Sequence, residues 1–437
     1  MSAAARIEIT PADGLVDQPR RIVAYGFAPV AEVVVQASLA PADGSLWQSR
    51  ATFVADARGT VSVADTAPIA GDWQEADPAA PVWAMRRTRL PARPELGEDT
   101  APLRIAVSAS AADGTVARAE YLLRFVAPGV TRRAVAEDGL SGTLFLPSGA
   151  GPHPAVVVLA GSGGGMHEQR AALYAAHGYA ALALGYFKAP RRPDHISDTP
   201  LEYFEAALRW VRDHLRPANG FIAVSGVSRG GELALLLASR FPELVSAVVA
   251  YVPSAVVHGT LRAGRPGQPP DDTAWTWRGE ALPNIWRGNP QADWTAFNAA
   301  PAPGQAVRQA AAFLSVLRDP AHAAAARIPV ERIHGPVLLI SGTDDGFWPS
   351  TLYCEQIARQ LREHGHGWPV EHVVGDAAGH AIGLPQLPAT LIAKPHPVAG
   401  LVLDGGGTAA ANALASARSW TRVRAFLAQA ASATAQP

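Results

Sequence analysis

A Gly-Val-Ser-Arg-Gly pentapeptide at residues 226–230 constrains the fold of this chain more than any other feature. It follows an apolar stretch, 221–225, that is typical of a buried strand, and it precedes a helix predicted from Gly231 to Arg240. A serine between two such glycines marks a sharp turn from strand to helix, which holds the serine in a strained backbone conformation. The turn would lift the Ser228 hydroxyl above the sheet, near the positive end of the helix. We therefore expect Ser228 to be a catalytic nucleophile.

Further buried-strand signals alternate with helical stretches around this motif. A helical spacing of apolar residues occurs over 202–215, between two of the strands. The strands are predicted from continuous apolar runs, at 155–160, 180–184, 245–252 and 337–341. Strands that are apolar on both faces and alternate with helices indicate a mostly parallel sheet covered by helices on both sides. The fold class is therefore α/β, and we place this catalytic domain at residues 134–437.

The first third of the chain has a different pattern. Short stretches of alternating apolar and polar residues recur at 6–10, 21–25, 32–38 and 103–108. Asp-Gly pairs, which favour tight turns, punctuate them at 13–14, 43–44 and 113–114. Many short strands at regular spacing predict an immunoglobulin-like β-sandwich. We assign this domain to residues 1–133.

The segment 253–330 interrupts the alternation of strands and helices. It is polar, rich in proline and glycine, and contains four of the eleven tryptophans. A long segment between two core strands is either a cap over the active site or ordinary surface packing. We favour a cap, because segments that follow the carboxyl ends of strands shape such sites.

A serine nucleophile needs a histidine to accept its proton and an acid to orient that histidine. In a strand–turn–helix serine hydrolase the acid and then the histidine follow the serine along the chain. Asp345 lies in the turn after the strand at 337–341, and Asp344 is the second choice. Either aspartate could instead cap the helix that is predicted to begin near Ser350. His380 follows the next predicted strand, 370–374, and is the expected base.

The tetrahedral intermediate of such a reaction needs N–H donors for its oxyanion. One is expected from Arg229, directly after the nucleophile, and the others from the glycine-rich loop at 161–165. We assign them to Ser162 and Gly163. The loop does not fit a phosphate-binding motif, because no Lys-Ser or Lys-Thr pair follows it.

Three basic residues follow the strand at 180–184 and should lie on the catalytic side of the sheet. They are Lys188, Arg191 and Arg192. Cations at this edge could bind an anionic part of the substrate, such as the phosphates of coenzyme A. The alternative is a solvated basic loop.

Composition excludes several other classes of function. The formal net charge is −1, so binding to nucleic acid or to an anionic membrane is not expected. The single cysteine, Cys354, allows no internal disulfide, and His364, His366 and His372 lack the carboxylate or cysteine spacing of a metal site. We therefore expect no metal or redox cofactor. The first residues carry no charged and apolar leader and no apolar run is long enough to span a membrane, so a cytoplasmic protein is expected.

Seven short blocks, taken together, resemble a known family. They lie at 11–19, 142–147, 161–165, 200–205, 226–235, 328–331 and 379–380. Over nearly the whole chain the sequence resembles the acyl-CoA thioesterases and bile acid-CoA:amino acid N-acyltransferases, which belong to the α/β-hydrolase superfamily. The resemblance implies a nucleophile at Ser228, an acid at Asp345 and a base at His380. In the amino-acid-conjugating branch of this family the nucleophile is a cysteine. This chain has Ser228 at that position and therefore resembles the thioesterase branch.

The resemblance implies a serine hydrolase that cleaves acyl-CoA thioesters to free acid and CoA through an acyl-enzyme. A carboxylic-ester hydrolase or an acyltransferase with the same residues and a substrate other than CoA stays open, because such a triad does not determine the leaving group. The third alternative is a non-catalytic binding protein on a hydrolase scaffold. The expected partner is a small-molecule substrate, an acyl thioester or ester.

Overall fold

The structure of the chain is a computed structural model that describes residues 4–91, 99–299, 302 and 305–434. It divides into two compact units. The first comprises Met1–Ala127 and Gly383–Leu391, and the second comprises Pro128–Ile382 and Ile392–Pro437. The division between them falls at Ala127, six residues before the boundary that we expected from the sequence.

The first unit is the predicted β-sandwich. One sheet has the order β1 (Arg6–Thr10), β3 (Arg21–Tyr25), β6 (Val61–Ser62). The other has the order β2 (Asp13–Leu15), β10 (Val116–Arg124), β9 (Leu103–Ala111), β4 (Glu32–Leu39), β5 (Leu46–Val54), β7 (Ala70–Gly71), and β5 also pairs with β8 (Arg86–Arg89). A short helix, α1 (Ala80–Trp83), accompanies them. Alternate side chains of β4 are buried, Val33, Val35 and Ala37 among them, because successive residues of a strand point to opposite faces.

The segment Gly383–Leu391 joins this first unit although it is distant from it in sequence. The Ala389 N–H donates to the Trp83 carbonyl, and the Gln386 amide donates to the Gln18 carbonyl. These bonds hold a late part of the chain against the sandwich, an arrangement that no local sequence pattern predicts.

The second unit is built on one mixed sheet. Its order is β11 (Thr131–Val135), β12 (Gly142–Leu146), β14 (Ala180–Leu184), β13 (Ala155–Leu159), β16 (Ile222–Val227), β17 (Ala247–Tyr251), β20 (Val337–Gly342), β21 (Val370–Gly375). β12 is antiparallel to both of its neighbours, and the strands from β14 to β21 are parallel. Numbered along the chain, the spatial order is 1-2-4-3-5-6-7-8, which is the order of the α/β-hydrolase fold, as the sequence predicted.

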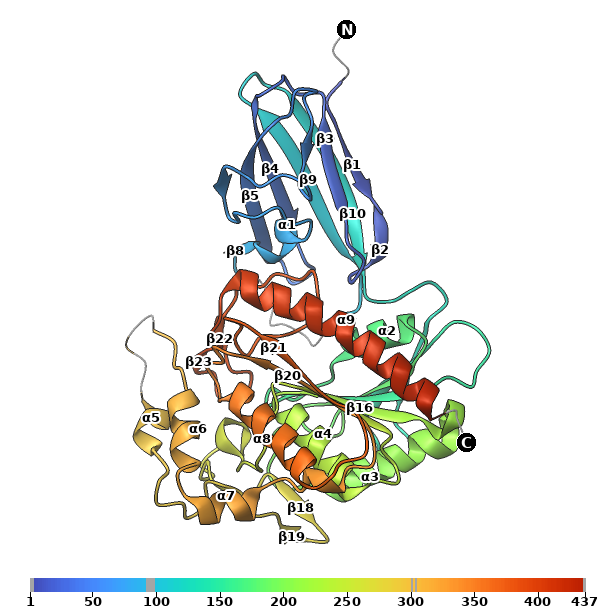
Figure 1. The fold of residues 1–437 in the computed structure, drawn as a ribbon, viewed down its shortest axis with the longest axis vertical. Helices are drawn as coiled ribbons and strands as arrows, with labels where there is room; N and C mark the ends of the chain where they lie inside the picture. Colours follow the sequence, from blue (N-terminus) through green and yellow to red (C-terminus); the bar gives the residue numbers. More distant parts are fainter. Residues whose placement is uncertain (1–3, 92–98, 300–301, 303–304, 435–437) are drawn as a thin grey trace. The chain divides into compact units, whose positions relative to one another are not determined.

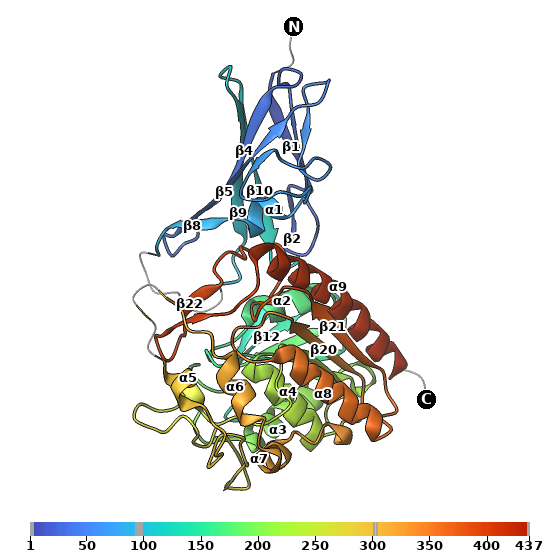
Figure 2. The same ribbon diagram turned by 60° about the vertical axis from the view of Figure 1, so that its left-hand side comes forward.

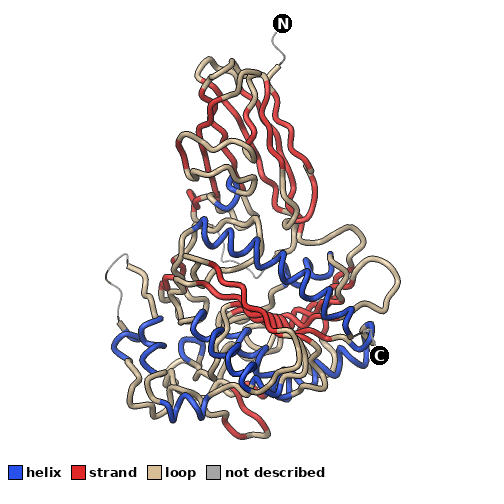
Figure 3. The backbone as a smooth tube through the Cα atoms, viewed as in Figure 1, coloured by secondary structure: helices blue, strands red, loops and turns tan. Residues whose placement is uncertain are grey.

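Helices cover both faces of this sheet, as Figures 1 and 3 show. α2 (Glu168–Ala176) and α9 (Ala409–Ala433) lie on one face, where Tyr174 packs against Trp420 with ring centroids 5.1 Å apart. α3 (Leu201–Trp210), α4 (Arg229–Arg240) and α8 (Ser350–Glu363) lie on the other. Every residue of β13, β14 and β17 is buried, because neither face of these strands reaches water.

The remaining helices and strands connect these layers. α3 continues into η1 (Val211–Leu215), and η2 (Ala218–Gly220) precedes β16. The predicted cap segment holds η3 (Leu261–Ala263), β18 (Trp275–Trp277), β19 (Glu280–Ala281), α5 (Trp294–Asn298), α6 (Ala310–Val316) and α7 (Pro320–Ala326), and η4 (Val330–Arg332) begins at its last residue. β18 pairs with β15 (Thr199–Pro200), and β22 (Ala393–Pro395) pairs with β23 (Val402–Asp404). Figures 1 and 2 show α5, α6 and α7 together on the side of the unit where α8 lies.

Within the described residues, no helix is both long enough and apolar enough to cross a membrane.

Candidate active site

Ser228 lies in a tight turn between β16 and α4. Its backbone is in a region that L-residues rarely adopt, with φ at 59° and ψ at −121°. The flanking glycines are sterically required: a Cβ at Gly226 would lie 1.9 Å from the Gly230 carbonyl oxygen, and one at Gly230 would lie 2.4 Å from the Ala160 carbonyl oxygen. The Ser228 N–H donates to the Tyr251 carbonyl at 2.8 Å. The Gly-x-Ser-x-Gly sequence therefore produces the strained elbow that its spacing predicts.

Asp345 and His380 meet at the carboxyl ends of β20 and β21. His380 Nδ1 lies 2.9 Å from both carboxylate oxygens of Asp345, and the exposed fractions of the two residues are 9% and 7%. Asp345 also accepts hydrogen bonds from the backbone N–H groups of Phe347 and Trp348. The carboxylate fixes the proton of the neutral imidazole on Nδ1, which leaves Nε2 as a proton acceptor.

Asp344, the second choice for the acid, faces elsewhere. Its carboxylate pairs with Arg308 at 2.5 Å and accepts a hydrogen bond from the Gly407 N–H at 2.8 Å. Of the two neighbouring aspartates, the structure therefore brings Asp345 to the histidine.

His380 Nε2 is buried and has no hydrogen-bond partner among the described residues, so no such bond joins it to Ser228. The imidazole stacks on Phe347 with centroids 4.4 Å apart, and Phe347 lines the same pocket as Ser228. Catalytic hydrogen bonds are often long in unliganded enzymes and shorten when substrate binds. The geometry thus places an available acceptor next to the pocket that holds the serine.

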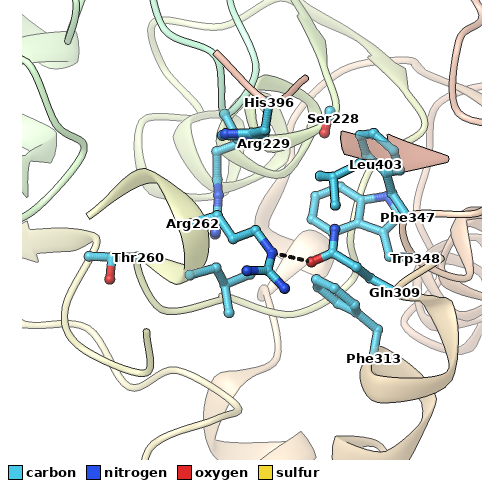
Figure 4. A pocket seen from close by; sticks show the side chains of 12 residues that line it. Ser228, Arg229, Thr260, Arg262, Gln309, Phe313, Phe347, Trp348, His396 and Leu403 are labelled. Atoms are coloured by element: carbon cyan, nitrogen blue, oxygen red, sulfur yellow. Dashed lines mark hydrogen bonds between the residues drawn. The ribbon is translucent and has the colours of Figure 1, made fainter. Parts of the chain in front are cut away.

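A pocket around Ser228 is formed entirely by residues of the second unit (Figure 4). Its apolar wall comes from Leu261, Phe313, Phe347, Trp348 and Leu403. Its polar lining comes from Ser162, Ser228, Arg229, Thr260, Arg262, Gln309 and His396. The segment predicted as a cap supplies Thr260, Leu261, Arg262, Gln309 and Phe313. Arg262, Gln309 and His396 were not predicted as site residues from the sequence. The only sequence signal for Arg262 and Gln309 is that they lie in the segment 253–330, which was predicted to be a cap.

Of the three residues predicted to bind the oxyanion, two line the pocket of Ser228 and one does not. A Cβ at Gly161 would be 3.9 Å from Ser228 Oγ, so the loop at 161–165 borders the serine. Ser162 and Arg229 line the pocket, whereas Gly163 is not among the lining residues. Arg229 is the first residue of α4, and the first N–H groups of a helix have no partner within the helix. The backbone N–H of Arg229 is therefore free of a partner within the helix and suitably placed to donate to an oxyanion.

The three predicted basic residues do not line this pocket. Lys188 Nζ donates to the Pro397 carbonyl at 2.6 Å, and Arg191 donates to the Leu140 carbonyl at 3.0 Å. The Arg192 guanidinium packs 4.5 Å from the centre of a tyrosine ring. The described contacts of these side chains stabilise loops of the second unit, and the structure does not bring them to Ser228.

No group of three or more His, Cys, Asp or Glu side chains suited to a metal ion occurs in the ranges that the structure describes. His366 and His372 bond to the Gly335 carbonyl and to the Ser341 hydroxyl, respectively. Cys354 is fully buried in α8, and burial raises the pKa of its thiol well above the ordinary value.

A buried ion pair links the turn at Ser228 to the segment 253–330. Arg229 and Glu232, with exposed side-chain fractions of 2% and 0%, pair at 2.9 Å in the first turn of α4. Arg229 Nη2 also donates to the Gly259 carbonyl at 2.7 Å, and Trp275 Nε1 donates to Glu232 at 2.9 Å. Burial raises the pKa of the Glu232 carboxyl, and the Arg229 charge opposes that shift. The pair therefore fixes the residue that follows Ser228 against the segment that walls the pocket.

Glu232→Ala should lower the free energy of unfolding by about 3–5 kcal/mol, because it leaves the Arg229 charge buried without a counterion. Urea unfolding measures the loss. The matched control is Glu205→Ala, which breaks a partly exposed pair with Arg209 on α3 and should cost less than about 1 kcal/mol. Equal losses in the two variants would contradict a structural role for the buried pair.

His396 holds the Ser162 side chain at the edge of the pocket. Its Nδ1 accepts hydrogen bonds from the backbone N–H groups of Val398 and Ala399, so the neutral ring carries its proton on Nε2. That Nε2–H donates to Ser162 Oγ at 2.9 Å. Burial and the nearby positive charges, Arg262 foremost, lower the pKa of His396 to about 4. The ring is therefore neutral near pH 7.

His396→Gln should make stability less sensitive to acid. Between the folded pKa of about 4 and the ordinary value of 6.5, the unfolded chain binds a proton at His396 that the folded chain does not. Stability therefore falls as pH drops through this window, and the wild type should lose about 3 kcal/mol more than the variant. Urea unfolding at about pH 7 and about pH 4 measures the difference. Equal losses would show that folded His396 titrates normally.

Comparisons with known proteins match both units. The family described as "BAAT / Acyl-CoA thioester hydrolase C terminal" matches residues 199–433, and "Acyl-CoA thioester hydrolase/BAAT N-terminal region" matches residues 17–137. The chain is 30% identical over 419 residues to acyl-coenzyme A thioesterase 1 of Homo sapiens, covering 94% of this chain and 93% of that protein. It is 31% identical over 439 residues to acyl-coenzyme A thioesterase 6 of Mus musculus, covering 97% and 96%. Among solved structures, a thermostable carboxylesterase cloned from a metagenomic library aligns with a TM-score of 0.39 and 17% identity, covering 70% of this chain and 89% of that one.

Proposed function

Because this chain belongs to the acyl-CoA thioester hydrolase/BAAT family, we propose that it hydrolyses acyl-CoA thioesters to the free acid and CoA through an acyl-enzyme. The observation that carries the proposal is the hydrogen-bonded pair of Asp345 and His380. The His380 ring stacks on Phe347, and Phe347 lines the same pocket as Ser228. A strained serine, an oriented imidazole and backbone N–H donors are the parts that acyl transfer needs.

In the first half of the reaction, Ser228 Oγ attacks the thioester carbonyl carbon. The serine proton passes to His380 Nε2, and the Asp345 carboxylate stabilises the imidazolium through Nδ1–H. The carbonyl oxygen becomes an oxyanion that accepts hydrogen bonds from the N–H groups of Arg229 and of the loop residues Ser162 and Gly163. The C–S bond then breaks, and the CoA sulfur leaves as a thiol with the proton from His380.

In the second half, a water molecule attacks the acyl-enzyme. His380 Nε2 takes one proton from the water and returns it to Ser228 Oγ as the C–O bond of the acyl-enzyme breaks. The free acid leaves, and the serine is regenerated. The segment 253–330 acts as a cap in this scheme, because it supplies Arg262, Gln309 and Phe313 to the wall around the acyl group.

The test is hydrolysis of acyl-CoA thioesters of several chain lengths beside the p-nitrophenyl esters of the same acids. We expect release of free CoA at rates that depend on chain length. Cleavage of the p-nitrophenyl esters alone would identify a carboxylic-ester hydrolase instead. If neither class is cleaved until an amine or alcohol acceptor is added, the chain is an acyltransferase.

A further inference from the structure

Arg262 is a cation in the pocket that has no counterion among the residues that the structure describes. Arg262, partly buried in η3, lines the pocket together with Ser228. Its Nε donates to Gln309 Oε1 at 2.8 Å, its Nη2 donates to the Phe297 carbonyl, and its guanidinium lies 4.2 Å from the centre of the Phe297 ring. These partners are all neutral, and no carboxylate among the described residues pairs with Arg262. Figure 4 shows the Arg262 and Gln309 side chains meeting inside the pocket.

Other arginines near the pocket are neutralised. Arg229 has the buried carboxylate of Glu232 at 2.9 Å, and Arg308 has Asp344 at 2.5 Å. Arg262 is different, because burial lowers the pKa of its guanidinium and no acidic neighbour opposes that shift. An arginine nevertheless keeps its charge in a protein. A partly buried charge without a partner is costly, and an anionic ligand that supplies the partner removes part of this cost.

The guanidinium can still bind a ligand. Its described hydrogen bonds engage Nε and Nη2, so the N–H groups of Nη1 remain for a further acceptor. Leu261, Phe313 and Leu403 line the same pocket. Apolar neighbours exclude water and thereby strengthen a bond between the cation and a carboxylate. A substrate that suits this pocket therefore has an apolar body and an anionic end.

We propose that Arg262 binds a carboxylate at the far end of the acyl group, so that the preferred substrates are thioesters of dicarboxylic acids. The inference rests on the proposed function, in which Ser228 takes up the acyl group. Because Ser228 and Arg262 line one pocket, an acyl chain that reaches from the thioester carbonyl at Ser228 to Arg262 stays within that pocket. The phosphates of CoA are the other anions of such a substrate, but the long pantetheine chain separates them from the thioester. A carboxylate on the acyl group matches the site better.

The test compares acyl groups that differ in one terminal carboxylate. Succinyl-, glutaryl- and adipoyl-CoA are paired with butyryl-, valeryl- and hexanoyl-CoA, and kcat/KM is measured for each. For at least one pair the wild type should favour the dicarboxylic member, and Arg262→Gln should lower that ratio by about 10- to 100-fold, the range of one charge-assisted hydrogen bond. Arg262→Lys should keep part of the preference, because it keeps the charge.

The control variant is Arg318→Gln, which removes an exposed arginine of the same segment that does not line the pocket. It should leave the ratio unchanged. Because the ratio compares two substrates of one protein sample, a lower folded fraction of any variant does not affect it. A wild type that favours the monocarboxylic member of every pair, or an Arg262→Gln ratio equal to that of the wild type, would overturn the proposal.

Two further measurements separate this inference from the proposed function. If Arg262 binds CoA phosphates instead, Arg262→Gln should weaken both members of each pair equally and leave the corresponding p-nitrophenyl half-esters unaffected. Binding of free adipate and hexanoate, measured by calorimetry, requires no catalysis. Adipate should bind about tenfold more tightly than hexanoate to the wild type and lose that advantage in Arg262→Gln. If no thioester is hydrolysed but this binding difference holds, the proposed function fails and the anion site stands; without the difference, the anion site fails.

Discussion

Ser228→Ala should lower kcat/KM for acyl-CoA hydrolysis by at least about 10⁴-fold, because it removes the atom that forms the acyl-enzyme. The variant should still fold normally, because the hydrogen bond from Ser228 to the Tyr251 carbonyl comes from the backbone N–H and not from the side chain. Any remaining activity should come from the oxyanion donors and from substrate binding, which persist without the nucleophile. Release of free CoA under single-turnover conditions measures the loss.

The matched control for this substitution is Ser148→Ala, which removes an exposed hydroxyl in the loop after β12. Its kcat/KM should stay within about twofold of the wild type, because surface substitutions of this kind are close to neutral. A Ser228→Ala protein with more than about a tenth of the wild-type activity would show that another group attacks the thioester.

Asp345→Asn should lower kcat by roughly 10³- to 10⁴-fold while leaving the fold intact. The amide can donate to His380 Nδ1 and thereby hold the proton on Nε2, where it blocks acceptance of the serine proton. The carboxylate also stabilises the imidazolium, and a neutral amide does not. Steady-state kinetics with a saturating acyl-CoA measure kcat, and a thermal melt checks the fold.

The adjacent aspartate offers a close control. Asp344→Asn removes a charge one residue away and weakens the pair with Arg308, but it leaves the bond between Asp345 and His380 in place. Its kcat should fall by less than about tenfold. If Asp344→Asn is as damaging as Asp345→Asn, the acid has been assigned to the wrong residue or the loop works as one unit.

Much of the fold was predictable because its signals are local. The buried strands appear as unbroken apolar runs, and β14, Ala180–Leu184, has the bounds that the sequence predicted. The turn around Ser228 was predictable because only glycine fits at Gly226 and Gly230, where a Cβ would meet backbone atoms. One local signal was misleading. Asp13-Gly14 resembles a hairpin turn, but these residues form β2, which pairs with β10 from more than 100 positions along the chain.

Residue order alone was therefore enough to predict the α/β-hydrolase sheet, the elbow and the likeness of the chain to its family, since each depends on residues that are near one another in the chain or on a set of short motifs. The surroundings of the serine depend instead on contacts between distant segments. Arg262 and Gln309 come from the cap segment, and His396 comes from the loop between β22 and β23. No periodicity or motif marks these positions, because their shared environment arises only when distant segments fold against each other. For the same reason, an arginine that looks ordinary in the sequence lies in the pocket as a cation with no counterion in the described part of the chain.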